Sequence, residues 1–589
     1  MSPIEFYTSQ KEKFQEQRSS VVNKQRLFRI IRLTVFLLIS GIVYFFWGDW
    51  ITITLTLVLG SVLFTFLVFR SSDLGGRRKY LESLIAINET EIEVLKGNWH
   101  HLPDEGDEFK LDDHAFSQDL DLFGRASFFQ YLNRAVLERG RNKVAQRLAS
   151  NHCEDILLKQ EGIQELGVKA EWRQDFSAHG SLVQSKISED AIVSWFSKYK
   201  VFTNKNTPIL VGAVSLISIA SMVLYAFEII PWTYIFAWFF VGVGIIGRSL
   251  KKISQLANHT SQVQDTFERY HILLERIETE EFKSQQLAAW QSRIHQKDKK
   301  ASEIFKEFSK LLNALDQRNN IIVSIPANGF FLRDLWISHK IEKWIKENAS
   351  KVEEWFTVIA DFDALNSFGN YAFNHQDYVY PEIIGEGKQV EAAQLGHPLL
   401  KSEGRVDNDF TMQNKEFFIV TGANMAGKST FLRTVGLSIV LANNGLPVCA
   451  KSFSYSPMKL ISSMRTTDSL SDNESYFFSE LKRLKHIIDT IEKEEHFIIL
   501  DEILKGTNSK DKAKGSQQFV EKLVRTGSTG IIATHDLSLC ELEAKLDQVK
   551  NYYFDAEIVN DELYFDYRLK TGVCQNMNAS FLLKKMGIV

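Results

Sequence analysis

The sequence predicts an all-α region that carries two transmembrane helical hairpins, followed by a C-terminal α/β domain. Three observations lead to this fold class. Long apolar runs without charged residues stand in two pairs, within residues 33–69 and 208–246. Between and after these pairs, apolar residues recur at the three- and four-residue spacing of amphipathic helices. From about Pro381 onward, short apolar runs separated by turns replace that spacing, as is typical of an α/β domain.

The composition is that of a multi-domain protein with reduced cysteines. A chain of 589 residues offers material for roughly two to four domains. The net charge of −4 gives no global basic field that would indicate a nucleic-acid partner, so any such site must be a local patch. The cysteines have neither paired nor metal-ligand spacing, which favours incidental thiols in a reducing compartment. They are Cys153, Cys449, Cys540 and Cys574.

The first hairpin is predicted over residues 33–69. Residues 1–32 before it are polar and charged and lack the features of a cleaved signal, so we expect a cytoplasmic N-terminal segment. The hairpin consists of two uncharged apolar runs joined by a short break at Gly48–Trp50. Basic residues, among them Arg32 and Arg70, flank its outer ends, which places both ends in the cytoplasm by the positive-inside rule.

The second hairpin is predicted over residues 208–246 and repeats this arrangement. Its two apolar runs are joined by a turn at Glu228–Pro231, and Lys205 and Arg248 lie beyond its ends. The alternative, four buried helices of a soluble protein, would require a very large interior. We therefore expect a multi-pass protein of the cytoplasmic membrane, with its N-terminus and C-terminal domain in the cytoplasm.

Two further stretches before the C-terminal domain are predicted to be helical. Residues 80–199 carry apolar side chains at helical spacing. Residues 254–380 begin with a charged region that has no proline or glycine as far as Asn319, and continue with an amphipathic segment, Ile341–Phe373. These stretches should form a helical core between the hairpins and the α/β domain.

A phosphate-binding loop lies near the start of the α/β domain, predicted over residues 381–589. The apolar run Phe417–Val420 leads to Gly422, and the segment Gly427–Thr430 opens an amphipathic helix, which gives G-x4-G-K-S in a strand–loop–helix context. Glycines allow backbone N–H groups to face a polyphosphate, and the helix N-terminus adds partial positive charge. Lys428 can reach the terminal phosphates and the Ser429 hydroxyl can ligate Mg²⁺. The chain is therefore predicted to bind a nucleoside triphosphate.

Two further apolar runs end in residues suited to hydrolysis. Residues 497–500 are followed by Asp501, expected to help hold Mg²⁺, and Glu502, expected to polarise the attacking water. Residues 530–534 are followed by His535, which is placed to contact the γ-phosphate, although an isolated histidine is more often a packing residue. A terminal β-hairpin is predicted from strands at 552–559 and 562–567.

The order of these motifs resembles the ATPase domain of the MutS family of mismatch-repair proteins. The resemblance rests on TGANMAGKSTFLRTVG, DEILKGTNSKDKAKG, ATHDLSLCELE and the closing RLKTGVCQNMNASFLLKKMG. The segment SYFFSEL, from Ser475 to Leu481, occupies the place of the family's signature segment, and HPLL and VDND match the entry to the domain. Upstream, residues 122–150 and 328–344 are more weakly similar to the family's helical core and lever.

The resemblance implies a composite ATPase with ATP and Mg²⁺ as ligands and a homodimer as the active form. His397 and Asn408 would contact adenine, and Ser429 and Asp501 would hold the metal. Catalysis would depend on Glu502, His535 and Lys428, with Ser475 presented to the γ-phosphate bound by a second subunit. The loop that cradles the phosphates would consist of Gly422, Ala423, Asn424, Met425, Ala426, Gly427, Lys428, Ser429 and Thr430.

The sequence also departs from the family. No segment near the N-terminus resembles the mismatch-reading domain with its Phe-x-Glu wedge, so direct mismatch recognition is not expected, while DNA binding by another surface stays open. The leading hypothesis is a membrane-anchored MutS-like ATPase coupled to DNA or to another partner. The alternatives are an ATP-driven transporter subunit and an ATP-gated membrane scaffold without DNA binding. SYFFSEL, in place of a Leu-Ser-Gly-Gly-Gln-like segment, and the absence of charges inside the apolar runs argue against transport.

Overall fold

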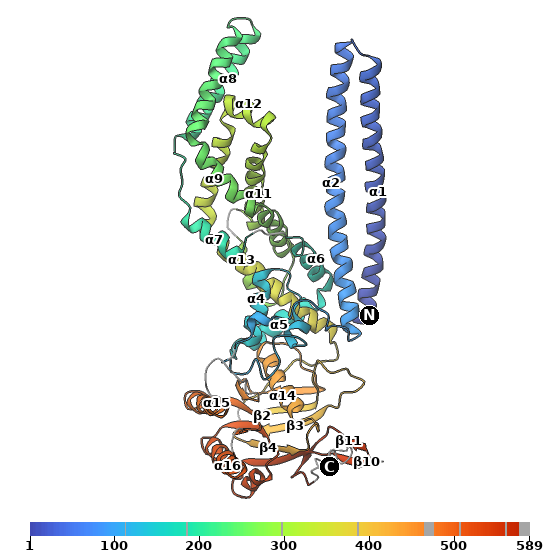
Figure 1. Cartoon of the computed structure of the whole chain (residues 1–589), viewed down its shortest axis with the longest axis vertical. Coiled ribbons are helices and arrows are strands. Elements are labelled where there is room, and N and C mark those ends of the chain that lie inside the picture. The colour runs from blue at the N-terminus through green and yellow to red at the C-terminus, as the bar shows by residue number, and fades with distance from the viewer. Residues whose placement is uncertain are drawn as a thin grey trace.

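Two helical hairpins and an α/β domain occupy opposite ends of an elongated molecule (Figure 1). The computed structural model describes residues 1–111, 113–183, 187–295, 299–385, 388–464, 476–505, 508–559 and 562–575. A helical core lies between the hairpins and the α/β domain. The predicted division into a helical N-terminal region and a C-terminal α/β domain is confirmed.

The first hairpin consists of α1 (Pro3–Phe45) and α2 (Trp50–Leu95). The polar N-terminal segment and the first apolar run thus form one continuous helix, capped by Ser2, rather than two separate units. Asp49 in the break between the helices accepts hydrogen bonds from the first backbone N–H groups of α2, which explains why the polar break starts a new helix. At the base of the hairpin, the Tyr7 hydroxyl contacts the helical core.

The second hairpin consists of α8 (Thr207–Ala226) and α9 (Trp232–Thr279), and α9 continues from the apolar part into the core. The helices α1, α2, α8 and α9 are each long and apolar enough to cross a membrane. In each of these helices, at most 17% of the most apolar 18-residue stretch is buried. The apolar stretches of these helices therefore do not form the interior of the described molecule, as the alternative of a soluble core would require.

The helical core is built around α13 (Arg333–Asn374), which packs against several of the surrounding helices. Aromatic side chains fill the contacts: Phe308 stacks on Trp344 with ring centroids 3.8 Å apart, and Trp355 is almost fully buried. The other helices of this region are α3 (Phe128–Leu132), α4 (Glu138–Ala149), α5 (Ile156–Val168), α6 (Ala170–Gly180), α7 (Glu189–Lys198), α10 (Gln285–Ile294), α11 (Ala301–Asp316) and α12 (Ile321–Phe331), with short 3-10 helices at Asp107–Phe109 and Gln317–Asn319.

The C-terminal domain contains a mixed sheet of order β12-β9-β4-β8-β7-β6, in which only β12 runs antiparallel to its neighbour. A smaller sheet has the order β1-β5-β2-β3. The strands are β1 (Glu382–Ile383), β2 (Lys388–Leu395), β3 (Asn408–Gln413), β4 (Phe417–Gly422), β5 (Ser452–Tyr455), β6 (Lys459–Ser463), β7 (His496–Asp501), β8 (Thr529–Ala533), β9 (Val549–Phe554) and β12 (Leu569–Thr571). The helices are α14 (Lys428–Asn443), α15 (Tyr476–Ile491), α16 (Ser509–Arg525) and the 3-10 helix Leu537–Ala544.

The predicted terminal hairpin is only partly correct. Residues 552–554 belong to β9 in the large sheet, and the hairpin is limited to β10 (Glu557–Val559) and β11 (Glu562–Tyr564). Its predicted turn at 560–561 lies outside the described residues. The apolar and aromatic residues of β9 pair with β4 instead, because a place beside a buried central strand removes more apolar surface from water.

Candidate nucleotide site

The predicted phosphate loop connects β4 to α14. All six residues of β4 are buried, as the continuous apolar run requires of a central parallel strand. Gly422 at its end has φ +148, and a Cβ there would lie 2.5 Å from the carbonyl oxygen of Phe554. Gly427 just before α14 has φ +106. Both glycines are therefore demanded by backbone conformation, and the first also by a close backbone approach.

Lys428 folds back over this loop. Its Nζ donates hydrogen bonds to the carbonyl oxygens of Gly422 and Ala423, at 2.9 and 3.0 Å. Burial lowers the pKa of Lys428, and the nearby carboxylates of Asp501 and Glu502 oppose this shift. The cation is therefore held beside the loop, at the place where a phosphate-contacting lysine must act.

The parallel register brings the ends of β4, β7 and β8 to one edge of the sheet. Asp501, the last residue of β7, pairs with Ala533 at the end of β8. The Ser429 hydroxyl at the start of α14 donates to Asp501 Oδ2 at 2.6 Å. Burial raises the pKa of Asp501, while the hydrogen bond from Ser429 opposes that shift.

This hydroxyl–carboxylate pair fits a magnesium ion. Mg²⁺ prefers hard oxygen ligands and is commonly held by one or two protein oxygens together with substrate phosphates. Within the described parts of the chain, no group of three or more His, Cys, Asp or Glu side chains could hold a metal ion by itself. The donor set therefore suits a metal that arrives with a polyphosphate.

Glu502 and His535 form a second polar pair beside the loop. His535 Nε2 lies 2.8 Å from Glu502 Oε1 and 3.2 Å from Lys428 Nζ. Nε2 carries the proton shared with Glu502 and cannot at the same time accept one from the lysine. The hydrogen bond from His535 lowers the pKa of Glu502 to about 2, so this carboxylate is ionised at neutral pH. Its backbone has φ +45, a strained conformation for glutamate that is fixed by its N–H bond to Ala533.

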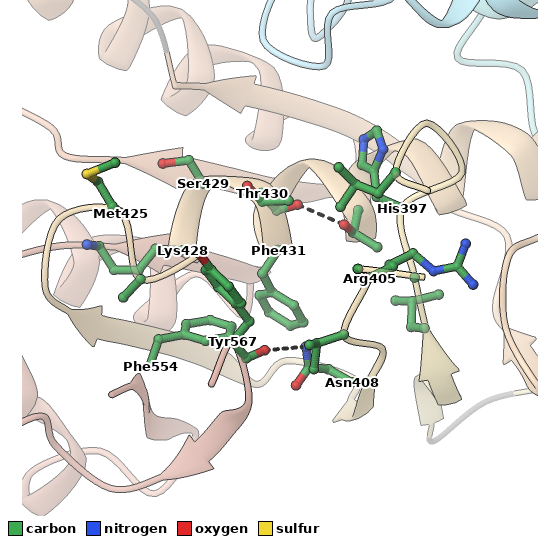
Figure 2. A pocket seen from close by; sticks show the side chains of 18 of the residues that line it. His397, Arg405, Asn408, Met425, Lys428, Ser429, Thr430, Phe431, Phe554 and Tyr567 are labelled. Carbon is green, nitrogen blue, oxygen red and sulfur yellow. Dashed lines mark hydrogen bonds between the residues drawn. The ribbon is translucent and has the colours of Figure 1, made fainter. Parts of the chain in front are cut away.

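A cavity of about 570 Å³ continues from the loop toward β3 and the chain end (Figure 2). His397 lines it and is partly buried, and desolvation lowers its pKa to about 4, so the ring is neutral at physiological pH. Asn408 lines it too, but its amide is engaged: Nδ2 donates to the carbonyl of Tyr567 at 3.0 Å and Oδ1 accepts from the N–H of Leu569 at 2.7 Å. Asn408 thus holds the terminal segment against the cavity.

Comparisons with known proteins match this region. Residues 418–584 match MutS domain V. The DNA mismatch repair protein MutS of Aquifex pyrophilus is 32% identical over 236 residues, 39% of this chain and 27% of that protein. MutS of Chlorobium chlorochromatii is 31% identical over 252 residues, 41% of this chain and 28% of that protein. MutS protein homolog 4 of Homo sapiens is 28% identical over 232 residues, 38% of this chain and 24% of that protein.

Over residues 418–584, the C-terminal domain is similar to MutS domain V. The chain spans about a quarter of the length of these curated relatives. The matched residues contain the phosphate loop, the acidic pair after β7 and His535.

The structure places the predicted site residues around the loop and the cavity, except for Ser475. Lys428, Ser429, Asp501, Glu502 and His535 are joined by the contacts described above. The cavity itself is lined by Asn424, Met425, Ala426, Gly427, Lys428, Ser429, Thr430, Glu502, His535, His397 and Asn408. Gly422 and Ala423 are not among the residues that line the cavity. Their carbonyl oxygens accept hydrogen bonds from Lys428. Ser475 lies outside the described residues.

The sequence reasoning missed the aromatic wall of the cavity. Phe431, Phe554 and Tyr567 line it, with the rings of Phe431 and Phe554 5.7 Å apart. Arg405 also lines it and is paired with Asp407 through Nε at 2.6 Å. These residues come from four separate segments, so no local motif could have grouped them.

A buried glutamate links the signature segment to the acidic pair. Glu480 on α15 is 3% exposed, and its carboxylate accepts the backbone N–H groups of Leu504 and Lys505. Burial raises the pKa of Glu480, and these two bonds oppose the shift. Glu480 therefore fixes the backbone that follows Glu502. In the sequence, only the place of Glu480 within SYFFSEL pointed to a role for this residue in the site.

Proposed function

We propose that this protein is a membrane-anchored MutS-type ATPase, in which ATP binding and hydrolysis at a dimeric composite site are coupled to DNA or to a protein partner. The observation that carries the proposal is the convergence of Lys428, the Ser429–Asp501 pair and the Glu502–His535 pair at one sheet edge. The match of this region to MutS domain V supports the same reaction class.

Each group has a role that its position supports. Lys428 and the N–H groups at the start of α14 bind the phosphates of ATP. Ser429 and Asp501 hold Mg²⁺, which when bound neutralises phosphate charge. Glu502, ionised and oriented by His535, accepts a hydrogen bond from the attacking water and aligns it with the γ-phosphate. The aromatic wall of Phe431, Phe554 and Tyr567 offers an apolar surface for the base.

The composite part of the proposal concerns Ser475. By resemblance to the family, this hydroxyl faces the γ-phosphate bound by the partner subunit and donates to it as charge develops. A homodimer formed through the ATPase domains is then required for turnover. DNA binding is included because the curated relatives are named as DNA mismatch repair proteins.

Membrane attachment through α1, α2, α8 and α9 is supported by their arrangement. Both hairpins point away from the ATPase domain in the same direction (Figure 1). Exposed aromatic side chains gather at both tips, as at membrane interfaces, where amphipathic rings are favoured. They are Tyr44, Phe45, Phe46, Trp47, Trp50, Phe227, Trp232 and Tyr234. In this arrangement the N-terminus and the ATPase domain share the cytoplasmic side.

The experiment that tests the activity is ATP turnover by the full chain in detergent. Lys428→Ala should abolish turnover by weakening phosphate binding. Glu502→Gln should lower it by roughly 10²-fold or more, since the positioned base is lost, while ATP binding persists. Asp489→Asn, an acid at the half-exposed end of an ion pair on α15, is the matched control and should retain full activity. Turnover that is unchanged in both site variants would contradict the proposal.

The coupling is tested by binding of homoduplex, mismatched and branched DNA at several salt concentrations, with and without ATP. A DNA role predicts affinity that falls steeply with salt, because phosphate contacts release counterions. Absence of binding to all three substrates would leave a protein partner as the coupled ligand.

A further inference from the structure

The short helix α12 (Ile321–Phe331) has an exposed apolar face. Its eleven residues carry no charge. Ile321, Ile322, Val323 and Ile325 are 68%, 85%, 53% and 51% exposed. A helix of this length cannot cross a bilayer, which requires roughly 20 residues, and these side chains are not part of a protein core. The remaining physical reason for such a face is contact with an apolar surface outside the described chain.

The other end of α12 is packed tightly onto the second hairpin. A Cβ added to Gly242 of α9 would lie 1.9 Å from the carbonyl oxygen of Gly329, so the two backbones are in direct contact. The rings of Phe239 and Phe330 lie 5.4 Å apart. The hydroxyl of Ser218 on α8 donates to the carbonyl of Phe330 at 2.6 Å. The position of α12 along the hairpin is therefore fixed.

This contact sets the depth of α12, given the membrane attachment proposed above. Gly242 follows Trp232, at the tip of the hairpin, by ten residues, or about 15 Å at about 1.5 Å per helical residue. It precedes Arg248 by six residues, or about 9 Å. Measured from Arg248 at the cytoplasmic boundary, a depth of about 9 Å falls in the cytoplasmic half of a hydrocarbon core of about 30 Å. Figure 1 accordingly places α12 beside the shaft of the hairpin rather than at its base.

Both ends of α12 return to one polar cluster. Arg318 precedes the helix and Arg333 follows it, and each lies within ion-pair distance of Asp334, at 3.9 and 3.3 Å. Asn328, near the end of α12, exchanges hydrogen bonds with Asp334 at 2.9 Å in each direction. The apolar segment thus begins and ends at the same polar cluster around Asp334.

We propose that α12 is a half-inserted helix in the cytoplasmic leaflet, and that lipid acyl chains cover its exposed isoleucine and valine face. The proposal rests on the membrane attachment proposed above. Acyl chains are the occupant that the structure favours, because this face continues the exposed apolar surfaces of α8 and α9 at the same level. Arg318 and Arg333 of this polar cluster would then lie at headgroup level, where cations are stabilised by anionic lipids.

The position of α12 has a mechanical consequence. Leu332, with φ +48, is the single residue between α12 and α13. The helix α13 is 42 residues long, and its far end at Asn374 leads into the ATPase domain. We call α13 the central rod of the molecule. One end of this rod is therefore fixed in the bilayer, and the other end follows the nucleotide-binding domain.

The test is depth-dependent quenching in the full chain, reconstituted into phosphatidylcholine vesicles. Cysteine is introduced at Ile322 in a Cys153→Ser background and labelled with an environment-sensitive fluorophore, since the other three cysteines are buried. Ile217→Cys on α8 reports the hairpin. Leu157→Cys on α5, which is 58% exposed in the helical core, is the matched control. ATP turnover of each labelled protein verifies its fold.

Vesicles with brominated acyl chains should quench the label at 322 to an extent similar to the label at 217, and leave the label at 157 unquenched. If 217 is quenched and 322 behaves like 157, the membrane attachment stands and the insertion of α12 is wrong. A blue-shifted but unquenched label at 322 would mean that protein, such as a second copy, covers this face. If 217 is also unquenched, the membrane attachment itself fails.

Discussion

At the scale of single residues, the hydrogen bond between His535 and Glu502 determines how the site responds to acid. Without a partner, a glutamate carboxyl titrates near 4.5, and in the folded protein the pKa of Glu502 is about 2. Because the folded value is depressed, the bond stabilises the protein above the unfolded value, and this contribution is lost as the pH falls through the folded value.

We therefore predict the pH dependence of the effect of Glu502→Gln on stability. The difference in Tm between the native protein and this variant should be constant from neutral pH down to about 4.5 and should shrink as the pH falls toward about 2. Thermal unfolding in detergent at a series of pH values measures it, with Asp489→Asn as the control. A difference that grows with acidity would contradict the assigned direction of the shift.

The local part of the site could be predicted from sequence, and the assembled part could not. Gly422 to Thr430 are contiguous, and their spacing alone imposes strand, loop and helix. Tyr567 reaches the cavity because the terminal segment is held by the pairing of β12 with β9 and by the side chain of Asn408, which is 159 positions away in the sequence. Such a contact depends on the path of the whole chain, and no local pattern encodes it.

At the scale of elements, α15 and the segment after β7 are joined through Glu480. Its carboxylate satisfies two backbone N–H groups, and loss of a buried acceptor leaves them unpaired at a cost of about 1–3 kcal/mol. Because Leu504 and Lys505 lie within three residues of Glu502, we expect a shift of this backbone to move the acidic pair as well.

Accordingly, Glu480→Ala should lower both Tm and ATP turnover, whereas Glu480→Gln should recover part of each, since the amide oxygen still accepts a hydrogen bond. Thermal unfolding and turnover measured on the same preparations give the result. Lys485→Ala, an exposed position on the same helix, is the control. Equal defects in the Ala and Gln variants would mean that charge, rather than hydrogen bonding, is what the site needs.

The base of the first hairpin is held to α13 by Tyr7 and by the neighbouring Phe6, whose ring centroid lies 5.2 Å from that of Phe373. Tyr7 is 1% exposed, and its hydroxyl is hydrogen-bonded to the side chains of Asn370 and Asn374 on α13, at 3.0 and 2.8 Å. Tyr7→Phe keeps the ring and removes these bonds. These bonds act together with the contact between Phe6 and Phe373 to orient α1 relative to α13.

Tyr7→Phe should destabilise the helical region by about 1 kcal/mol and expose α1 to proteolysis below the proposed membrane segment. Limited proteolysis and thermal unfolding of the full chain in vesicles measure the two effects. Tyr44→Phe, an exposed tyrosine at the hairpin tip, serves as the control. A cleavage rate equal to that of the native protein would show that the other contacts of the hairpin suffice.

The length of an element also limited what the sequence could predict. The helices α1, α2, α8 and α9 are long and apolar enough to cross a bilayer, and their apolar runs could be recognised in the sequence. The helix α12 falls below that length, and its apolar residues match those of a buried core helix. Only the exposure of Ile322 and its neighbours separates the two interpretations, and exposure is a property of the folded chain.

At the scale of the whole molecule, the nucleotide site and the hairpins lie at opposite ends of a structure whose central connection is α13 (Figure 1). The core packs around this rod through large aromatic side chains such as Trp344 and Trp355. A closely packed helix transmits displacement better than it absorbs it. We therefore expect a change at the nucleotide-site end to be communicated to the hairpin end through α13 rather than dissipated in a linker.

The composite site predicts that ATP controls the oligomeric state. If Ser475 of one subunit binds the γ-phosphate held by Lys428 of the other, bound ATP links the two domains and hydrolysis releases them.

Glu502→Gln binds ATP without turnover and should therefore accumulate as a dimer with ATP, but not with ADP. Lys428→Ala should remain monomeric under both conditions. Mass measurement of the full chain in detergent distinguishes these states, and Ser475→Ala added to Glu502→Gln should abolish the ATP-dependent dimer. A dimer that persists without ATP, or in this double variant, would mean that other surfaces assemble the protein and that the site is complete within one subunit.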